Sequence, residues 1–217
     1  MRSSTMGHMA MLQGSLFDTA SEPRLRPLDG AVRRIPLSDG AWIDHVPGWV
    51  ERAELLFEAL VGQVAWRSEA RRMYDRTVDV PRLMASYGDD VPAPHPLLEE
   101  AKSILTRHYR GLPGADLATI GLCLYRDGGD SVAWHGDTIG GRVTEDPLVA
   151  IVSLGWRRRL ALRPRRGGSR SLRFDLGEGD LLVMGGSCQR TWEHAVPKTT
   201  RRVGPRVSVQ FRPLGVR

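Results

Sequence analysis

Two histidines and one aspartate have the residue types and spacing that could bind a metal ion. His135 and Asp137 are two positions apart, and His194 lies further along the chain. On an extended segment, residues two apart point to the same face, so His135 and Asp137 can converge on one point. Two imidazoles and one carboxylate can hold a ferrous ion on one face of its octahedron and leave the other positions for substrate and oxygen. A structural zinc site, or ordinary hydrogen-bonded polar groups in a β domain, would use the same residue types.

A second group of polar residues lies near the C-terminal end. Residues 206–212 (RVSVQFR) alternate between polar and apolar types, which predicts a strand with one core face and one face that presents Arg206 and Arg212. An ordinary surface strand would alternate in the same way. An iron oxygenase, however, needs an electron-donating cosubstrate, and the two carboxylates of 2-oxoglutarate suit planar guanidinium groups. Tyr125, which precedes His135, could add a phenol hydrogen bond to the same carboxylate as Arg206.

Short strands would have to position these residues. From residue 118 onward, short segments bounded by glycine and aspartate predict strands at 119–125, 131–135, 148–154, 159–162, 171–175, 180–184, 191–195 and 206–212. This spacing is typical of an all-β sandwich or jelly roll. Trp134 and Trp192, each close to one of the two histidines, are expected to pack in the core.

The first half of the chain has a different pattern. Helical periodicity predicts helices at 47–63 and 95–109, with short strands or an irregular flap at 66–68, 72–79 and 83–87. We expect a flexible lead over residues 1–30 and one catalytic domain over 31–217. Within that domain, helices and a substrate flap at 31–116 precede a jelly-roll core at 117–213.

Composition narrows the class of protein. The 217 residues are 41% hydrophobic and 26% charged, which excludes a chain that is disordered throughout. No apolar run approaches the roughly 20 residues that a membrane span needs, and the first residues are too polar for a secretory signal. The two cysteines, Cys123 and Cys188, are too few for a disulfide scaffold. We therefore expect a cytoplasmic monomer that does not contact a membrane.

Net charge gives only weak guidance about the partner. Lysine and arginine number 31 against 25 acidic residues, a balance of +6 that favours an anionic partner such as nucleic acid. Lysine occurs only at Lys102 and Lys198, and asparagine is absent, a bias that GC-rich coding would also produce. Charge alone therefore does not decide between a binding face and a solvated surface.

Taken together, several segments strongly resemble the AlkB family. The similar segments are residues 124–127 (LYRD), 130–137 (DSVAWHGD), 179–186 (GDLLVMGG), 192–198 (WEHAVPK) and 206–212 (RVSVQFR). Residues 80–83 (VPRL) and 87–88 (YG) are similar to the substrate flap of its animal-type DNA repair members. The resemblance extends over roughly residues 78 to 213, in the right order.

The resemblance implies an Fe(II)- and 2-oxoglutarate-dependent dioxygenase on a double-stranded β-helix, an α+β fold that is mostly β with helices packed on it. Such an enzyme uses O2 to remove alkyl groups from nucleobases such as 1-methyladenine and 3-methylcytosine, in DNA or RNA, and releases formaldehyde. By resemblance, the catalytic iron ligands are His135, Asp137 and His194. The implied 2-oxoglutarate partners are Arg206 and Tyr125 for the distal carboxylate and Arg212 for the carboxylate near the metal.

Four positions concern the substrate flap and departures from the family. Arg82 and Tyr87 fall where the family's flap approaches nucleic acid. Where the family usually has Asn-x-Tyr, this chain has Cys123, so a weakly bonding thiol replaces an amide donor in the 2-oxoglutarate pocket. Close relatives commonly carry an acidic residue just after the metal aspartate, whereas Ile139 lies there, which changes the expected base preference.

Two other functions agree with the same residues. One is an oxygenase of the same fold that acts on a small molecule or a protein side chain. The other is a module that binds damaged bases without turnover, since the Cys123 departure falls in the cosubstrate pocket. Succinate production coupled to a methylated oligonucleotide would distinguish the three functions.

Overall fold

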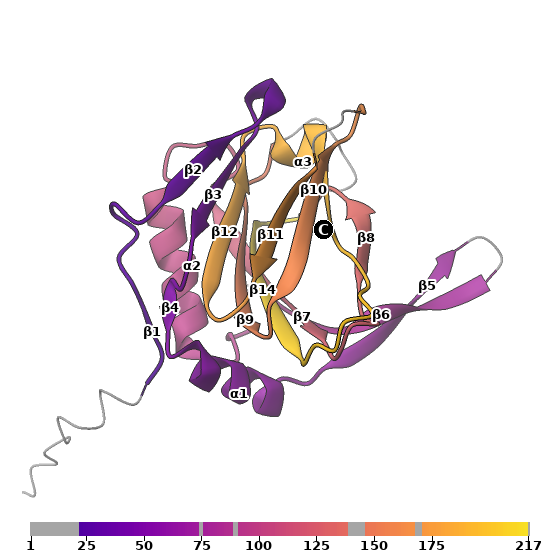
Figure 1. The fold of residues 1–217 in the computed structure, drawn as a ribbon. Helices are drawn as coiled ribbons and strands as arrows, with labels where there is room; N and C mark the ends of the chain where they lie inside the picture. Colours follow the sequence, from indigo (N-terminus) through magenta and orange to yellow (C-terminus); the bar gives the residue numbers. More distant parts are fainter. Residues whose placement is uncertain (1–21, 74–75, 89–90, 139–145, 168–170, 217) are drawn as a thin grey trace, which may run out of the picture.

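Two antiparallel sheets stacked face to face form the centre of the fold (Figure 1). The computed structural model describes residues 22–73, 76–88, 91–138, 146–167 and 171–216. The larger sheet has the strand order β2-β3-β12-β9-β14-β7-β6-β5, and the smaller sheet has the order β11-β10-β13-β8. This arrangement is a jelly roll, as the spacing of the predicted strands indicated.

The strands of the larger sheet are β2 (Arg33–Pro36), β3 (Trp42–Val46), β5 (Arg67–Met73), β6 (Arg76–Tyr87), β7 (Leu117–Tyr125), β9 (Val149–Gly155), β12 (Asp180–Gly185) and β14 (Arg206–Pro213). The smaller sheet contains β8 (Val132–His135), β10 (Arg158–Pro164), β11 (Leu172–Leu176) and β13 (Trp192–Val196). A separate pair joins β1 (Arg24–Leu25) to β4 (Val50–Glu51). A 3-10 turn (Ser38–Gly40) precedes β3, and the short helix α3 (Cys188–Thr191) precedes β13.

Side-chain alternation in the central strands separates two hydrophobic clusters. On β14, Val207, Val209 and Phe211 belong to the cluster on the helix side of the larger sheet. The polar residues between them face the space between the two sheets, where Ile151 and Leu182 contribute to the second cluster. Because strand side chains alternate with a period of two, β14 supplies core packing with one face and functional groups with the other.

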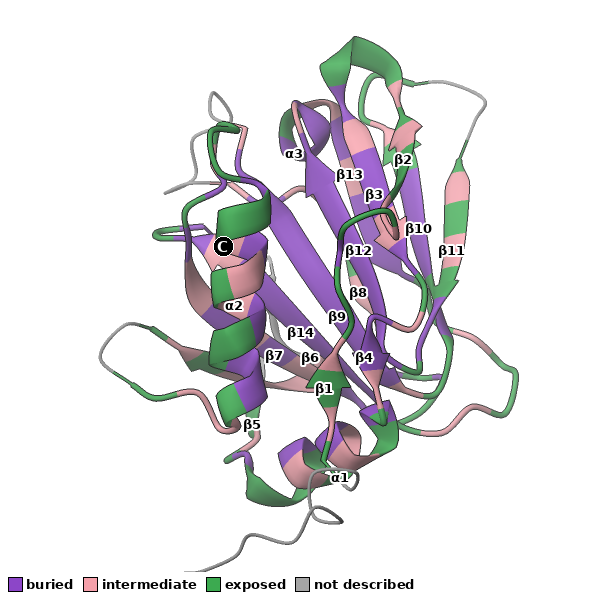
Figure 2. Ribbon diagram, turned by 90° about the vertical axis from the view of Figure 1, so that its left-hand side faces the viewer, coloured by how far each residue is buried: buried purple, intermediate pink, exposed green. Residues whose placement is uncertain are grey.

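Two helices cover the outer face of the larger sheet. They are α1 (Ala53–Gln63) and α2 (Pro96–His108), and both bury one side against the strands while the other side stays exposed (Figure 2). On α2, the buried residues have helical spacing: Leu97, Leu98, Ala101 and Leu105. Pro96 occupies the first turn, where a missing amide proton costs nothing, and His95 caps the helix through its Nδ1 atom, which accepts from the Leu97 amide at 3.2 Å.

The predicted first helix begins too early. Residues 47–52 form a turn and strand β4, and the helix starts only at Ala53. Gly48 and Arg52 both have positive φ, of 59° and 55°, which a right-handed helix does not allow. The predicted strands from residue 119 onward and the predicted second helix are confirmed to within two residues.

The predicted boundary of the flexible lead at residue 30 is also wrong. Strand β1 pairs with β4, the indole nitrogen of Trp49 donates to the Arg26 carbonyl at 2.8 Å, and Leu28 is buried. These contacts attach residues 24–28 to the domain. Residues 1–21 lie outside the described part of the chain.

The predicted flap is a long hairpin of β5 and β6 that extends beyond the stacked sheets (Figure 1). Its base is attached to the smaller sheet, because the Ser131 amide donates to the Pro81 carbonyl at 2.8 Å. In the described ranges, no helix is both long enough and apolar enough to cross a membrane. The monomeric state and the cytoplasmic location stay predictions.

Candidate metal centre

His135, Asp137 and His194 lie together although they come from distant parts of the sequence. Their candidate ligand atoms are all within 4.8 Å of one another. His135 ends β8 and is paired directly with His194 on β13, so that the ring centroids are 4.2 Å apart. Asp137 follows β8, and its Oδ2 atom lies 3.7 Å from Nε2 of His194. Gly136 between the ligands has no room for a side chain, because the Gln189 carbonyl occupies that space.

The donor atoms of this cluster are oriented by the surrounding protein. The Asp137 amide donates to Oε1 of Gln189 at 2.9 Å, which fixes the backbone at the aspartate. Nδ1 of His135 lies 2.8 Å from the Ala133 carbonyl, which can only accept, so Nδ1 donates and Nε2 is the nitrogen available to a metal ion. Oδ2 of Asp137 is buried and has no hydrogen-bond partner among the described residues. Because such an oxygen is costly to bury alone, a bound cation fits this site.

The protonation states also suit a cation. Burial, helped by the neighbouring His135, lowers the pKa of His194 to about 3. Burial opposes ionisation of Asp137, but Arg212 and the two imidazoles still hold its pKa below the ordinary value. At neutral pH the aspartate is therefore ionised and His194 is neutral, which are the forms that bind metal ions.

A narrow pocket between the two sheets adjoins the cluster and contains two arginines. Arg206 is fully buried, and its Nη2 atom donates to Oγ of Ser153 at 2.6 Å. Its Nε and Nη1 atoms, and Nε of Arg212, have no partner among the described residues. Nη2 of Arg212 lies 3.3 Å from Oδ1 of Asp137. Unused guanidinium donors in a buried pocket suit the carboxylates of an anionic ligand.

Tyr125 lies opposite Arg206 on the neighbouring strand β7. The Cζ atom of Arg206 is 5.2 Å from the centre of the Tyr125 ring, and both residues line the pocket. Burial raises the pKa of Tyr125 to about 12, with a smaller contribution from the nearby Cys123, so the hydroxyl keeps its proton and can donate. Burial lowers the pKa of Arg206, and the nearby Tyr125 opposes this effect.

The structure brings most of the other predicted site residues to this pocket, but not all. Arg82 and Cys123 line it, and Nη1 of Arg82 donates to the Ser131 carbonyl at 3.2 Å. Tyr87 does not line it, because residues 82 and 87 are an odd number apart on β6 and Tyr87 packs on the helix-side core. Its contact with nucleic acid stays a prediction. Ile139 lies outside the described residues.

The two tryptophans differ from each other. Trp192 is buried in the core between the sheets, as predicted. The prediction for Trp134 is wrong, since this side chain is 37% exposed. The guanidinium of Arg163 lies over its ring at 4.3 Å and is held there by Glu193, whose Oε2 accepts from Nε and Nη2 of the arginine.

Sequence reasoning did not identify four polar residues of this site: Ser153, Gln189, Ser208 and Gln210. The alternation of β14 contained the signal for two of them, because Ser208 and Gln210 lie between Arg206 and Arg212 on the same face. Ser153 follows from the same rule on β9, where Ile151 also faces inward. Gln189 lies on the very short helix α3, which has no periodic signal.

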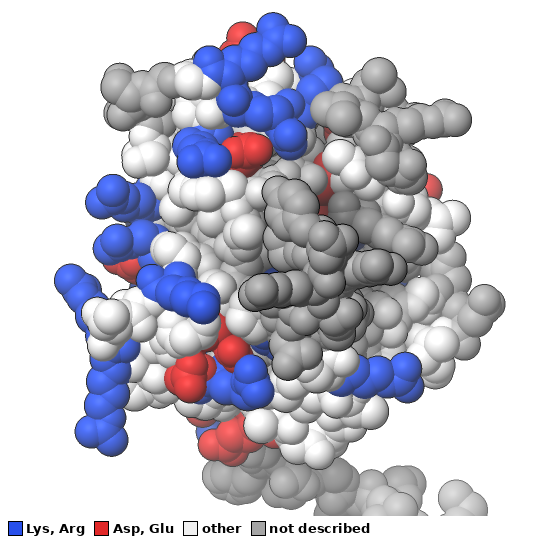
Figure 3. Space-filling model, turned by 90° about the vertical axis from the view of Figure 1, so that its right-hand side faces the viewer, with Lys and Arg blue, Asp and Glu red and all other residues white. Residues whose placement is uncertain are grey.

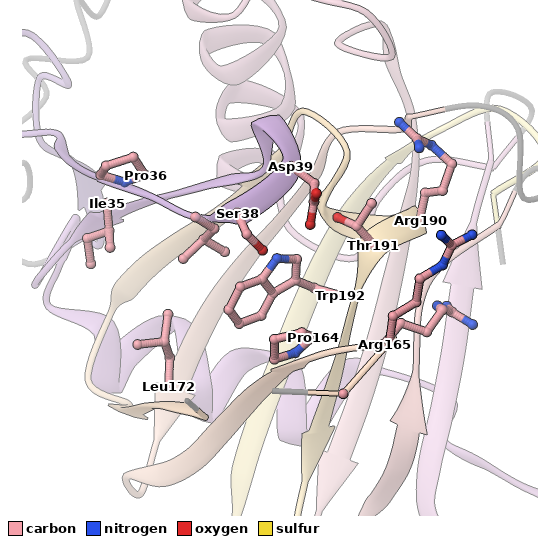
Figure 4. Close-up of a pocket in the computed structure, with 13 residues that line it drawn as sticks. Ile35, Pro36, Ser38, Asp39, Pro164, Arg165, Leu172, Arg190, Thr191 and Trp192 are labelled. Carbon is pink, nitrogen blue, oxygen red and sulfur yellow. The ribbon is translucent and has the colours of Figure 1, made fainter. Parts of the chain in front are cut away.

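A larger cleft lies elsewhere, between β2, β10 and α3, with Trp192 at its centre (Figure 4). None of the sequence-predicted site residues lines it. Two of its arginines already have partners: Arg190 pairs with Asp146 at 2.9 Å, and Arg165 contacts the Gln189 carbonyl at 3.4 Å. Among the described residues, the metal-ligand cluster therefore belongs to the narrow pocket and not to this cleft.

Comparison with known proteins gives consistent results. Residues 46–212 match the family model of the 2OG-Fe(II) oxygenase superfamily. The chain is 30% identical over 220 residues to human "Alpha-ketoglutarate-dependent dioxygenase alkB homolog 3", covering 89% of this chain and 73% of the relative. It is 32% identical to "DNA oxidative demethylase ALKBH2" of Arabidopsis thaliana, covering 83% and 68%. The solved structure of OsALKBH1 has a similar fold, with a TM-score of 0.53, 14% identity, and coverage of 83% of this chain and 100% of the other.

Proposed function

The chain belongs to the AlkB family within the 2OG-Fe(II) oxygenase superfamily and is an Fe(II)- and 2-oxoglutarate-dependent dioxygenase, and we propose that its substrates are N-alkylated bases in DNA or RNA. The relatives from Arabidopsis thaliana and Homo sapiens that are called ALKBH2 are named DNA oxidative demethylases. When bound, iron and 2-oxoglutarate supply the oxidation of an N-alkyl carbon by O2. A hydroxymethyl group on a ring nitrogen then leaves as formaldehyde without a protein nucleophile.

The three clustered residues are proposed to hold the iron. His135 and His194 would bind through imidazole nitrogens, and Asp137 through the carboxylate oxygen that has no other partner. Three protein ligands leave positions for cosubstrate and oxygen, as an oxygenase needs. This cluster of three candidate ligands is the observation that supports an iron site in this pocket.

The arginines of the narrow pocket are proposed to hold 2-oxoglutarate. Arg206, with the Tyr125 hydroxyl, would bind one carboxylate, and Arg212 would bind the other, close to the metal ligands. Burial between two sheets excludes most water from these contacts, which strengthens each charged hydrogen bond.

The surface beside His135 supports a nucleic-acid substrate. Trp134 precedes this residue, is exposed, and is stacked with Arg163. An aromatic ring with a guanidinium can stack on bases of a single strand, and a duplex base would have to be extruded before reaction. On the side of the molecule where β8 lies in Figure 1, the described part of the surface shows more Lys and Arg than Asp and Glu (Figure 3). Positive charge there would attract phosphates.

The test is demethylation of oligonucleotides that contain 1-methyladenine or 3-methylcytosine. With Fe(II) and 2-oxoglutarate, we expect one formaldehyde and one succinate for each methyl group removed, measured by mass spectrometry and succinate assay. The His135→Ala variant is the control and should produce neither. Succinate release without loss of the methyl group from any oligonucleotide would contradict the proposal and favour a small-molecule or protein substrate. Binding without succinate would favour a module that does not turn over.

A further inference from the structure

Strand β8 carries His135 and leads to Asp137, but strand pairing sets little of its position. It lies at the edge of the smaller sheet, with β13 as its neighbour. The pairing joins His135 to His194 and Val132 to Val196, and its register is irregular between these two pairs. A short, irregular edge strand is a weak support for a metal ligand, because few ladder hydrogen bonds hold its register. Other contacts must therefore align β8 with β13.

One buried arginine joins the segments at the ends of these two strands. Arg158, the first residue of β10, is 3% exposed. Its Nη1 atom donates to the Asp127 carbonyl at 2.6 Å, and its Nη2 atom donates to the Asp130 carbonyl at 2.9 Å and to the Pro197 carbonyl at 3.0 Å. Asp127 and Asp130 belong to the turn that precedes β8, whereas Pro197 directly follows β13. The guanidinium therefore bridges the start of one ligand-bearing strand and the end of the other.

The three acceptors are main-chain carbonyls, so Arg158 fixes the path of the backbone. A guanidinium is planar and presents its N–H groups in a rigid fork, so the directions of its hydrogen bonds are fixed relative to one another. Low dielectric in the interior strengthens each of these bonds. A displaced turn would leave buried polar groups without partners, which is costly. The turn is thus confined to one position beside the segment after β13.

The turn before β8 is also made rigid by its own contacts. The Asp130 carboxylate accepts from the Arg126 amide at 2.8 Å and from Nε and Nη2 of the same arginine at 2.9 Å. The Thr199 amide donates to the Gly128 carbonyl at 2.9 Å, and a Cβ atom at Gly128 would collide with the Thr199 carbonyl. Because the turn is rigid, its position determines where β8 begins.

We propose that Arg158 is a positioning residue of the metal centre, which holds the turn before β8 against the segment after β13 and thereby keeps His135 opposite His194. This inference rests on the proposed metal ligands. At the other end of the same segment, the side chain of Gln189 accepts from the Asp137 amide. The ligand-bearing segment is thus held at both ends, which preorganises its two donor groups.

The experiment measures Co(II) binding without 2-oxoglutarate, through the affinity from calorimetry and the visible d–d absorption, which reports the geometry of the ligands. Arg158→Met keeps the length of the side chain without its donors. We expect it to weaken Co(II) binding by roughly tenfold, the low end of the range for residues behind metal ligands, and to change the absorption bands. Arg158→Lys can still reach the two carbonyls that share Nη2, so its effect should be smaller. The matched control is Arg159→Met, because this exposed neighbour pairs with Asp175 at 3.5 Å, and it should equal the parent.

Three further variants separate positioning from loss of stability. Gly128→Ala leaves Arg158 in place but pushes the turn away from the segment after β13, so it should change the affinity and the absorption bands in the same way. Gly129→Ala, in the same turn, should have little effect, because its Cβ atom would meet one side-chain oxygen of Asp127 at 3.1 Å. Leu105→Ala removes a fully buried side chain from α2, so it should lower the Tm but keep parent-like Co(II) binding.

The outcomes distinguish the role of Arg158 from the ligand assignment. Parent-like affinity and absorption in Arg158→Met and Gly128→Ala would overturn the role of Arg158 and leave the ligand set intact. A loss in Arg158→Met that Leu105→Ala matches would show a general effect of stability and would also overturn it. If Arg158→Met does not fold, Arg158→Lys and Gly128→Ala decide in the same way. Parent-like Co(II) binding by His135→Ala would overturn the ligand set, and this inference with it.

Discussion

Arg212 lies beside Asp137, with Nη2 of the guanidinium 3.3 Å from Oδ1 of the carboxylate. The other oxygen of the carboxylate faces His194 and has no hydrogen-bond partner in the described residues. The same aspartate is therefore in contact with a proposed cosubstrate arginine and with a proposed metal ligand. In the proposed assignment, metal binding and cosubstrate binding are linked through one carboxylate.

Replacing Asp137 with asparagine should remove iron binding but keep the fold. A neutral amide is a weaker ligand, and its NH2 group cannot accept from Arg212 in the way that an ionised oxygen does. We expect turnover to fall by at least about a hundredfold, since changes even to residues behind metal ligands cost roughly 10- to 100-fold. Iron-dependent oligonucleotide demethylation measures this. The control is Asp175→Asn, an exposed carboxylate on β11 that pairs with Arg159. More than a few per cent of parent activity with added iron would contradict the assignment.

Replacing Arg206 with methionine should separate cosubstrate binding from stability. The guanidinium is buried, bonded to Ser153, and has two nitrogen atoms without partners among the described residues. An apolar side chain of similar length removes a buried charge, which is often neutral or stabilising. We expect the Tm of the protein without cosubstrate to stay equal or rise, while the 2-oxoglutarate requirement rises by roughly ten- to a hundredfold. Calorimetry and the 2-oxoglutarate dependence of turnover measure the two effects. An unchanged requirement would show that Arg206 does not contact the cosubstrate.

Much of the site was predictable because successive side chains of a strand point to opposite faces of the sheet. Arg206 and Arg212 are six residues apart and therefore share a face of the strand. The apolar residues at the odd positions between them lie on the opposite face, so the face with the arginines is the polar one. The same parity rule explains why Arg82 reaches the pocket and Tyr87 does not. The pairing of His194 with His135 was not predictable from parity, because register depends on how the whole sheet packs.

Two errors have specific physical causes. The sequence predicts Trp134 in the core, but its side chain is exposed. The pairing of β8 with β13 is irregular between His194 and Val196, and both Val132 and His135 line the pocket despite their odd spacing. Strict alternation fails there, and the indole is left on the surface.

Near the N-terminal end of the described residues, strand β2 has the sequence RRIP. It is too short and too polar to be recognised as a strand, although it pairs with β3 at the edge of the larger sheet.

The stability of the protein should decrease in acid through the cap of α2. His95 accepts from the Leu97 amide, and burial lowers its pKa despite the opposing effect of Glu22. In the unfolded chain, His95 takes up its proton near pH 6.5, whereas in the folded chain it does so only at a lower pH. The stabilisation is therefore complete above about pH 6.5 and is lost as the pH falls below it. A serine cap accepts at any pH. His95→Ser should therefore lose less stability than the parent between pH 7.5 and pH 5.5, as measured by urea unfolding.

The matched variant for this prediction is His95→Ala, which has no cap at either pH. It should be less stable than the parent at pH 7.5 by about 1 kcal/mol, the usual effect of removing a helix cap. Its loss on acidification should be as small as that of His95→Ser. Equal losses in the parent and in His95→Ser would show that another group titrates.

Removing the exposed indole should weaken binding of long substrates and spare short ones. Trp134 and Arg163 form a stacked pair outside the pocket, whereas the clustered histidines lie inside it. If the indole stacks on a base that flanks the target, Trp134→Ala should weaken binding of a methylated single-stranded oligonucleotide by roughly 1–3 kcal/mol, the usual range for one stacked base. The kcat/KM for a methylated nucleoside, which has no flanking base, should not change.

The matched control is Trp156→Ala, because Trp156 is 56% exposed and lies at the opposite end of β10 from Arg163. Equal loss with both substrates would mean that the substitution disturbs His135, and equal affinity in both variants would mean that nucleic acid does not contact this face.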